Sequence, residues 1–304
     1  MGLTEVCGGA LMASNAQNVL FDVQGPRGRV ITLVLNVVGL LLVAALAWVV
    51  LGKLADQGQL EATKWTQLFT ARSWENFFLP GILSTLKAAG LAVVLSVVFG
   101  LVFGVGRLSS LAVVRAVSTV VVEFFRAVPV LVMMIFFYLG IGRTGIVQPT
   151  ETPFWAVVLA LMFYNGSVIA ELIRSGVHGL PRGQREAGLV VGLTESQTLR
   201  SILLPQALTA MLPSLLSQFV VILKDTALGY IITYPELLAS ARRLGSGDGN
   251  ILQTLLMAAV IFVVINFALT SLAQWLSGFL SYRTSGRTKP TVAPAPAAVA
   301  PAAR

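Results

Sequence analysis

The residues best placed to do chemistry include a polar stretch, residues 184–205, that lies between two long apolar runs. Apolar residues at spacing i, i+1, i+4 favour a short amphipathic helix over about residues 184–196. Gly192 can end a helix, and Thr194 can cap the next turn by accepting a backbone N–H. A surface helix between two membrane spans suits contact with a soluble partner. The alternative interpretation is a solvated connecting loop.

Charged residues form two pairs near the ends of apolar runs: Glu123 with Arg126, and Glu171 with Arg174. A separation of three residues lets each pair form an ion pair on a helix. A charge in the hydrocarbon core costs at least roughly 2.5–3.5 kcal/mol, so such residues usually face a partner or a water-filled path. Structural pairing and a role in gating or translocation are therefore both open.

Uncharged polar residues interrupt another apolar run at Asn165, Gly166 and Ser167. Gly166 opens the backbone, and the two polar side chains could hydrogen-bond to a zwitterionic solute. Hydrogen bonding between helices is the alternative. Lys224 and Asp225 close a later run, where Lys224 could attract an anionic solute or simply extend its ammonium group to the membrane interface.

Composition identifies an integral membrane protein. Of 304 residues, 56% are hydrophobic and 11% are charged, and mean hydropathy is +0.84, whereas soluble proteins carry roughly 25% charged residues. The net charge of +8 does not indicate nucleic acid, because Lys and Arg collect in cytoplasmic loops and near anionic lipid. One Cys and one His argue against a disulfide framework and a metal site. Neither a catalytic constellation nor a phosphate-binding loop occurs in the sequence.

Six apolar segments are long enough to cross a hydrocarbon core of about 30 Å. After a polar segment, 1–29, the first span covers 30–52. A cleavable signal peptide is the alternative, but the run is longer than the roughly 7–15-residue apolar region of a signal peptide and favours an uncleaved span. A connecting segment, 53–80, carries aromatic residues that suit the membrane interface. The further spans are expected near 81–106, 117–140 and 154–173, and within 201–223 and 249–282. The basic, then Pro/Ala-rich tail, 283–304, is predicted to be disordered.

Local signals refine these segments. Gly100 and Gly104 lie four residues apart and permit close helix packing. Pro129 should kink or restart the third span. A short helix is expected over residues 234–244, started by Pro235.

Six spans place both termini on one side of the membrane. With the termini inside, twelve Lys and Arg face the cytoplasm and eight face outward, with Arg126 within a span left aside. This bias favours cytoplasmic termini, an extracytoplasmic 53–80 segment and a cytoplasmic 184–205 stretch.

The polar stretch resembles the E-A-A-x-x-x-G-x(9)-I-x-L-P signature of ABC importer permeases. The matching residues are Glu186, Ala187, Gly188, Gly192, Ile202, Leu204 and Pro205. Gly188 stands where the pattern usually has Ala, which is expected to loosen the helix locally. Four further segments resemble the polar amino-acid uptake family, and most of all its glutamate importers: VEFFRAVPVL at 122–131, YNGSVIAELIRSGV at 164–177, LPRGQ at 180–184 and LKDTAL at 223–228.

The resemblance implies an all-α integral membrane protein with the type I ABC importer fold: five core helices over 81–282 plus one extra N-terminal transmembrane helix. It implies a transport subunit of a bacterial cell membrane, not an enzyme, which imports a polar amino acid, glutamate, by alternating access. ATP and Mg²⁺ would bind a separate ATPase, and this chain would bind no cofactor. The other implied partners are a second permease subunit, identical or homologous, and an extracytoplasmic amino-acid-binding protein, besides membrane lipid.

The same resemblance assigns the 184–205 stretch to docking on the ATPase, with Glu186 as its polar anchor and Gly192 allowing the close turn. A self-sufficient ion-coupled carrier or channel is the alternative function. An inverted repeat or a carboxylate at mid-membrane would favour that alternative. The sequence shows no such repeat, and the carboxylates lie at the ends of the spans.

Overall fold

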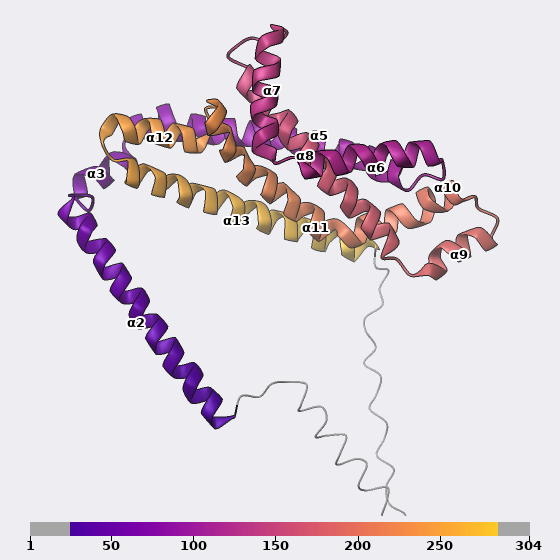
Figure 1. Cartoon of the computed structure of the whole chain (residues 1–304), viewed down its shortest axis with the longest axis horizontal. Helices are drawn as coiled ribbons and strands as arrows, with labels where there is room; N and C mark the ends of the chain where they lie inside the picture. The colour runs from indigo at the N-terminus through magenta and orange to yellow at the C-terminus, as the bar shows by residue number, and fades with distance from the viewer. Residues whose placement is uncertain (1–24, 285–304) are drawn as a thin grey trace, which may run out of the picture. The chain divides into compact units, whose positions relative to one another are not determined.

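The computed structural model describes residues 25–284, and every regular element in that range is helical (Figure 1). The predicted disorder of the tail and most of the predicted N-terminal segment lie outside these residues. Two compact units divide the chain, Met1–Ala62 and Thr63–Arg304. The first unit contains α2 (Pro26–Asp56), whose 31 residues include the whole predicted span 30–52.

The second unit holds the remaining spans. Its long helices are α5 (Leu79–Arg107), α8 (Thr152–His178), α11 (Leu204–Asp225) and α13 (Ile251–Thr284). Shorter elements join them: α3 (Ala62–Thr66), η1 (Gln67–Phe69), α4 (Ala71–Ser73), η2 (Trp74–Phe78), α6 (Ala112–Ala127), α7 (Val130–Thr144), α9 (Arg182–Val190), α10 (Glu195–Thr198), η3 (Leu199–Leu203), η4 (Thr226–Ile232) and α12 (Leu237–Asp248). Among the described residues, five helices are long and apolar enough to cross a membrane, or six if α6 and α7 form one broken span.

The predicted third span, 117–140, is two helices rather than one. Helix α6 ends at Ala127, α7 begins at Val130, and their axes are bent by 99°. Pro129 precedes α7 and has no N–H to continue the hydrogen-bond ladder. The predicted restart is therefore confirmed, and the size of the bend makes α7 point away from α6 in Figure 1.

Helices α5 and α8 pack closely because two glycines of α5 have no side chain. A Cβ atom at Gly100 would lie 2.7 Å from Ile169 Cβ and 3.0 Å from the Gly166 carbonyl oxygen. One at Gly104 would lie 3.1 Å from the Ala170 carbonyl oxygen. The close packing predicted from the Gly100–Gly104 spacing is confirmed, and it brings the ends of α5 and α8 together.

The segment before α5 belongs to the helical bundle. Leu68 and Phe78 are buried in a hydrophobic cluster with Leu237 and Leu244 of α12 and with residues of α13. The aromatic residues Trp65, Trp74 and Phe77, expected at the membrane interface, pack against this cluster. The second compact unit accordingly includes residues 63–80 of the connecting segment.

The helix expected over 234–244 is shifted along the chain, and it begins at Leu237 instead of at Pro235. Glu236 caps it, since its carboxylate accepts from the N–H groups of Leu238 at 2.7 Å and Ala239 at 2.6 Å. The hydroxyl of Tyr234 donates to the Ser84 carbonyl oxygen at 2.7 Å. Tyr234 is thereby held on α5, outside the helix.

The glycine contact generates a test of the α5–α8 packing. Gly100→Ala should destabilise the protein by about 1–3 kcal/mol, because the added methyl group overpacks the contact with Ile169. Gly90→Ala on the same helix meets nothing within 4 Å and should be neutral or stabilising by up to about 1 kcal/mol. Thermal unfolding of the two purified variants in detergent measures the difference. Equal melting temperatures would contradict the packing account.

Candidate functional site

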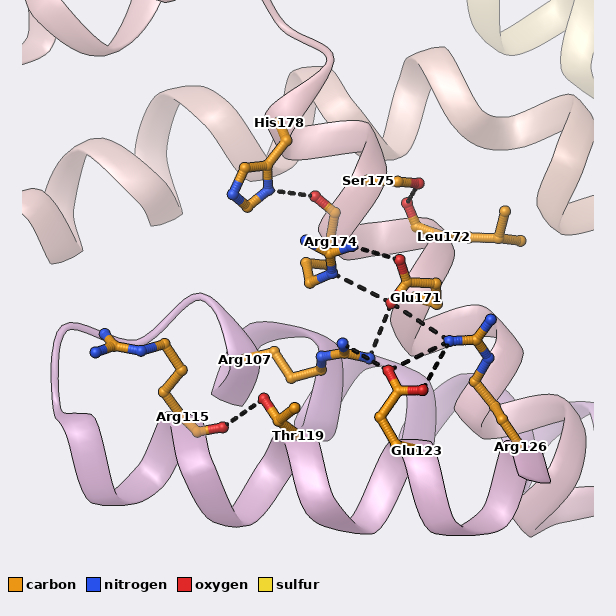
Figure 2. Close-up of polar contacts among 10 residues, drawn as sticks. All are labelled: Arg107, Arg115, Thr119, Glu123, Arg126, Glu171, Leu172, Arg174, Ser175 and His178. Carbon is orange, nitrogen blue, oxygen red and sulfur yellow. Dashed lines mark hydrogen bonds and ion pairs between the residues drawn. The ribbon is translucent and has the colours of Figure 1, made fainter. Parts of the chain in front are cut away.

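Arg107, the last residue of α5, lies between carboxylates from two other helices (Figure 2). Its Nη2 is 2.9 Å from Glu123 Oε1 on α6, and its Nη1 is 2.9 Å from Glu171 Oε2 on α8. The Arg107 side chain is only 7% exposed. Because desolvated charges are stable only when paired, this arginine depends on both partners.

Two further arginines complete an ionic cluster around Arg107. Arg126 of α6 lies 3.4 Å from Glu123 and 3.7 Å from Glu171. Arg174 donates to Glu171 Oε1 at 2.6 Å and to Oε2 at 3.2 Å. The ion pairs predicted for Glu123–Arg126 and Glu171–Arg174 are both confirmed. The structure adds that Arg107 joins them into one cluster of three arginines and two glutamates.

A cavity of about 320 Å³ lies beside this cluster. Glu123, Arg126 and Ala127 line it from α6, and Tyr164 and Val168 line it from α8. Its volume holds several water molecules. It presents charged groups of both signs and one aromatic ring to whatever enters it.

The neighbouring residues of α8 point elsewhere. Asn165 and Ser167 are fully buried, and a Cβ at Gly166 would lie 2.8 Å from Phe99 Cδ1 of α5. The amide nitrogen of Asn165 donates to the Leu161 carbonyl oxygen at 3.2 Å. In the described structure, Asn165 Oδ1 and Ser167 Oγ have no hydrogen-bond partner. The structure therefore does not bring these three residues to the cavity.

Lys224 and Asp225 form the last turn of α11, at the opposite end of that helix from the 184–205 stretch. Lys224 is exposed and Asp225 is half-buried. Neither lines the cavity beside the ionic cluster. The structure thus leaves the two residues outside that site.

The polar stretch folds as two short helices, not as the single helix predicted over 184–196. Helix α9 ends at Val190, because Gly192 takes a φ of 88°, which lies in the left-handed region. Thr194 then caps α10: its hydroxyl accepts from the Gln197 N–H at 3.3 Å, and Gln197 Oε1 accepts from the Thr194 N–H at 2.9 Å. The predicted end at Gly192 and cap at Thr194 are confirmed. We call α9, α10 and the turn between them the coupling loop, residues 182–198.

An ion pair closes the coupling loop. Arg185 of α9 donates to the two carboxylate oxygens of Glu195 on α10 at 2.6 and 3.0 Å. This carboxylate raises the pKa of the Arg185 guanidinium above its usual value. Gln184 accepts from Gln206 of α11 at 3.1 Å. Three contacts, two of them charged, thus fix how α9 lies against the following helices.

Gly188 is the point of closest approach within the loop. It is buried, and an added Cβ would lie 2.6 Å from Thr198 Cγ2 and 3.2 Å from Ile202 Cδ1. The expected loosening at this position is replaced by tight packing, because Thr198 occupies the space of an alanine methyl group. Glu186 and Ala187 remain exposed on α9. Ile202 lies in η3, and Leu204 and Pro205 form the start of α11.

The sequence also carries the signature of a transport family. Residues 96–281 match the family described as "Binding-protein-dependent transport system inner membrane component". The chain belongs to this family. It is therefore a multi-pass inner-membrane permease component of an ABC transporter, not an enzyme, and the family implies assembly with a separate ATPase, which binds the ATP, and with a binding protein. The predicted type I importer fold is confirmed.

Individual relatives extend this match. The glutamate transport system permease protein GluD of Corynebacterium glutamicum is 47% identical over 221 residues, which cover 73% of this chain and 81% of the relative. The glutamate/aspartate import permease protein GltK of Escherichia coli O157:H7 is 31% identical, with 66% and 92% covered.

Solved structures share the fold. The crystal structure of an amino acid ABC transporter with histidines matches with a TM-score of 0.60 and 30% identity, over 66% of this chain and 92% of that one. An inward-facing MetNI methionine ABC transporter matches with a TM-score of 0.57 at 18% identity, over 72% and 100%, and so shows the fold alone.

Arg107 was not predicted as a site residue, because no carboxylate lies within four residues of it in the sequence. Its partners lie on other helices, one of them 16 residues away and the other beyond α7, and no i, i+3 or i, i+4 spacing reveals them. The signal that could have found it is its place directly after the uncharged stretch 88–106.

The ionic cluster predicts unequal effects of two arginine substitutions. Arg107→Met should lower stability by about 1–3 kcal/mol, less than for a fully buried pair because Glu123 is 53% exposed. Arg115→Met removes the same charge from an exposed residue, and should cost about 1 kcal/mol or less, because within residues 25–284 the Arg115 side chain donates only to the Ser109 carbonyl oxygen, at 2.9 Å. Melting temperatures in detergent compare the two variants, and an Arg115 variant as unstable as the Arg107 variant would refute the cluster's role.

Proposed function

We propose that the chain is the transmembrane permease subunit of an ATP-driven importer of a polar amino acid, and that this amino acid is glutamate. The observation that carries the proposal is the 47% identity to a glutamate transport system permease protein over 81% of that relative. A second relative, 31% identical, is named for glutamate and aspartate import. Both matches cover more than two thirds of the relative, so they concern the whole permease domain.

The coupling loop is the part on which the ATPase would act. Glu186 and Ala187 are exposed on α9, while Gly188 and the Arg185–Glu195 pair hold α9 against the residues that follow. A rigid loop transmits movement better than a loose one. When the ATPase closes on ATP and Mg²⁺, α9 would move and carry Ile202, Leu204 and Pro205 with it into α11, an alternating-access change of rigid elements.

The ionic cluster would move with the loop. Helix α8 ends at His178 and leads directly into α9, and Arg107 fastens the same end of α8 to α5 and α6. We assign to these three helices the role of one rigid body during transport. Asn165, Gly166 and Ser167 would support it from within α8, where Asn165 and Ser167 are buried and Gly166 packs against Phe99 of α5.

The substrate would pass the cavity between α6 and α8. An amino acid with a carboxylate side chain can pair with Arg126 there, and its ammonium group can pair with Glu123. The cluster's excess of one positive charge suits a substrate with a net negative charge. Lys224 and Asp225, at the far end of α11, would meet the substrate on the extracytoplasmic side.

The assembly would contain ABC ATPase subunits, a second permease subunit, identical or homologous, and an extracytoplasmic amino-acid-binding protein. Both termini would lie in the cytoplasm, as the distribution of Lys and Arg favours. In this orientation the coupling loop faces the ATPase.

Reconstitution tests the function. Proteoliposomes that contain the chain, the ATPase, the binding protein and the second permease should accumulate radiolabelled glutamate only with ATP inside. The chain alone, with or without an ion gradient, should accumulate none. Uptake by the chain alone would support a self-sufficient carrier and refute the importer. ATP-dependent uptake of a different amino acid, with no uptake of glutamate, would refute the assignment of glutamate as the substrate but not the importer.

A substitution at Glu186 tests its role in docking the ATPase. Glu186→Lys should reduce ATP-driven uptake at least about tenfold, because charge reversal at a docked contact costs more than about 1.4 kcal/mol. Membrane insertion and melting temperature should stay unchanged, since no salt bridge in the described structure involves Glu186. Glu75→Lys, an exposed residue on η2, makes the same charge change away from the loop and is the control. Normal uptake by Glu186→Lys would contradict the docking role.

A further inference from the structure

A second cavity, of about 840 Å³, lies between the coupling loop and the ends of α5 and α8. We call it the loop cleft. Part of its wall is apolar and comes from four elements; this part includes Val105, Leu108, Val177, Leu180, Leu189 and Leu199. The rest of the lining is polar and dominated by arginine. The loop cleft is therefore amphipathic, with an apolar wall beside a basic one.

Its charges are only partly compensated. Five arginines and two glutamates line the loop cleft, an excess of three positive charges. Arg107 is neutralised by the ionic cluster, and Arg185 is neutralised by Glu195. Within the described structure, Arg115, Arg182 and Arg200 have no carboxylate partner, and one cleft carboxylate, Glu186, is left to offset them. Two positive charges thus remain without a counter-charge.

The loop cleft lies at the level where the apolar spans end. Arg107 is the last residue of α5, and His178 is the last residue of α8, and both line it. Apolar spans end where the hydrocarbon core gives way to lipid headgroups. The apolar wall and the arginines therefore lie at the depths of acyl-chain carbons and of headgroup phosphates.

We propose that the loop cleft binds an anionic phospholipid. Its phosphate would be held by Arg182 and Arg200, with Arg115 nearby, because guanidinium groups bind phosphate through two parallel hydrogen bonds. The first carbons of its acyl chains would lie along the apolar wall. Free phosphate would use the arginines but not the wall, and so fits the loop cleft less well. A lipid bound there contacts both the coupling loop and the end of α8, and so stabilises the loop's position.

Native mass spectrometry of the purified full-length chain in detergent tests this proposal. Phosphatidylglycerol should bind, and phosphatidylcholine at the same concentration should bind at least about fivefold less. The double variant Arg182→Gln/Arg200→Gln should lose about thirtyfold in phosphatidylglycerol affinity, since each basic residue at a membrane surface contributes roughly fivefold. The control Arg242→Gln/Arg243→Gln makes the same charge change on exposed residues of α12 and should bind as the wild type does. Arg182→Lys/Arg200→Lys keeps the charge and should retain most of the affinity.

Several results would overturn the proposal. Three results would contradict a lipid site in the loop cleft: equal binding of both lipids, unchanged binding by the glutamine variant, or an equal loss of binding in the α12 control. Binding of inorganic phosphate or of glycerophosphoglycerol, which lacks acyl chains, as tight as that of the whole lipid would show an anion site instead. If the wild type binds no lipid while the glutamine variant, with an unchanged melting temperature, loses binding of the ATPase subunit, the arginines belong to the ATPase contact.

Discussion

The double ion pair of Arg107 is the interaction on which the arrangement of the permease domain depends. One guanidinium group, almost fully withdrawn from solvent, joins Glu123 of α6 and Glu171 of α8 at 2.9 Å each. A charge in this position is tolerated only because both carboxylates reach it. Their reach depends in turn on Gly100 and Gly104, whose missing side chains let α5 approach the backbone of α8 at Gly166 and Ala170. Packing of two glycines thus makes the electrostatic link of three helices possible.

The ion pairs of Arg107 hold the end of α8, which leads into the coupling loop, in a fixed position. Arg174 pairs with Glu171 and lies four residues before His178, after which the chain enters the loop. Within the loop, the Gly188–Thr198 contact and the Arg185–Glu195 pair prevent α9 from moving independently of α10 and η3. A force applied at α9 can therefore reach α8 on one side and α11 on the other. Both the transport proposal and the lipid proposal rest on this continuity.

The sequence predicted those features that depend on local chemistry. Long uncharged runs predicted the spans, Gly192 and Thr194 predicted the break and the cap within the coupling loop, and the i, i+3 spacing predicted two ion pairs. Pro129 predicted the break between α6 and α7. Its angle of 99° depends on how α7 packs, with Met133 and Met134 buried against the core that includes α8, and no local signal contains that information.

Features fixed by tertiary contact could not be predicted in this way. The sequence of α8 has apolar residues on every face of the helix. It therefore did not reveal that Tyr164 would line a cavity while Asn165 and Ser167 would be buried. The start of α12 at Leu237 depends on a buried Glu236, which is a rarer cap than Ser, Thr or Asp. The role of Arg107 depends on the packing of three helices, which the sequence alone does not show.

Helices α5, α6 and α8 should move as one body when the coupling loop is moved. Spin labels on cysteines at Val113 of α6 and Ser175 of α8, both exposed, report that geometry in the assembled transporter once the single native Cys7 is replaced by Ser. Pulsed electron paramagnetic resonance should give the same Val113–Ser175 distance within about 2 Å without nucleotide and with bound ATP. The distance from a label at Val190 of α9 to a label on the second permease should change by more. A Val113–Ser175 distance that changes as much as the Val190 distance would contradict the account.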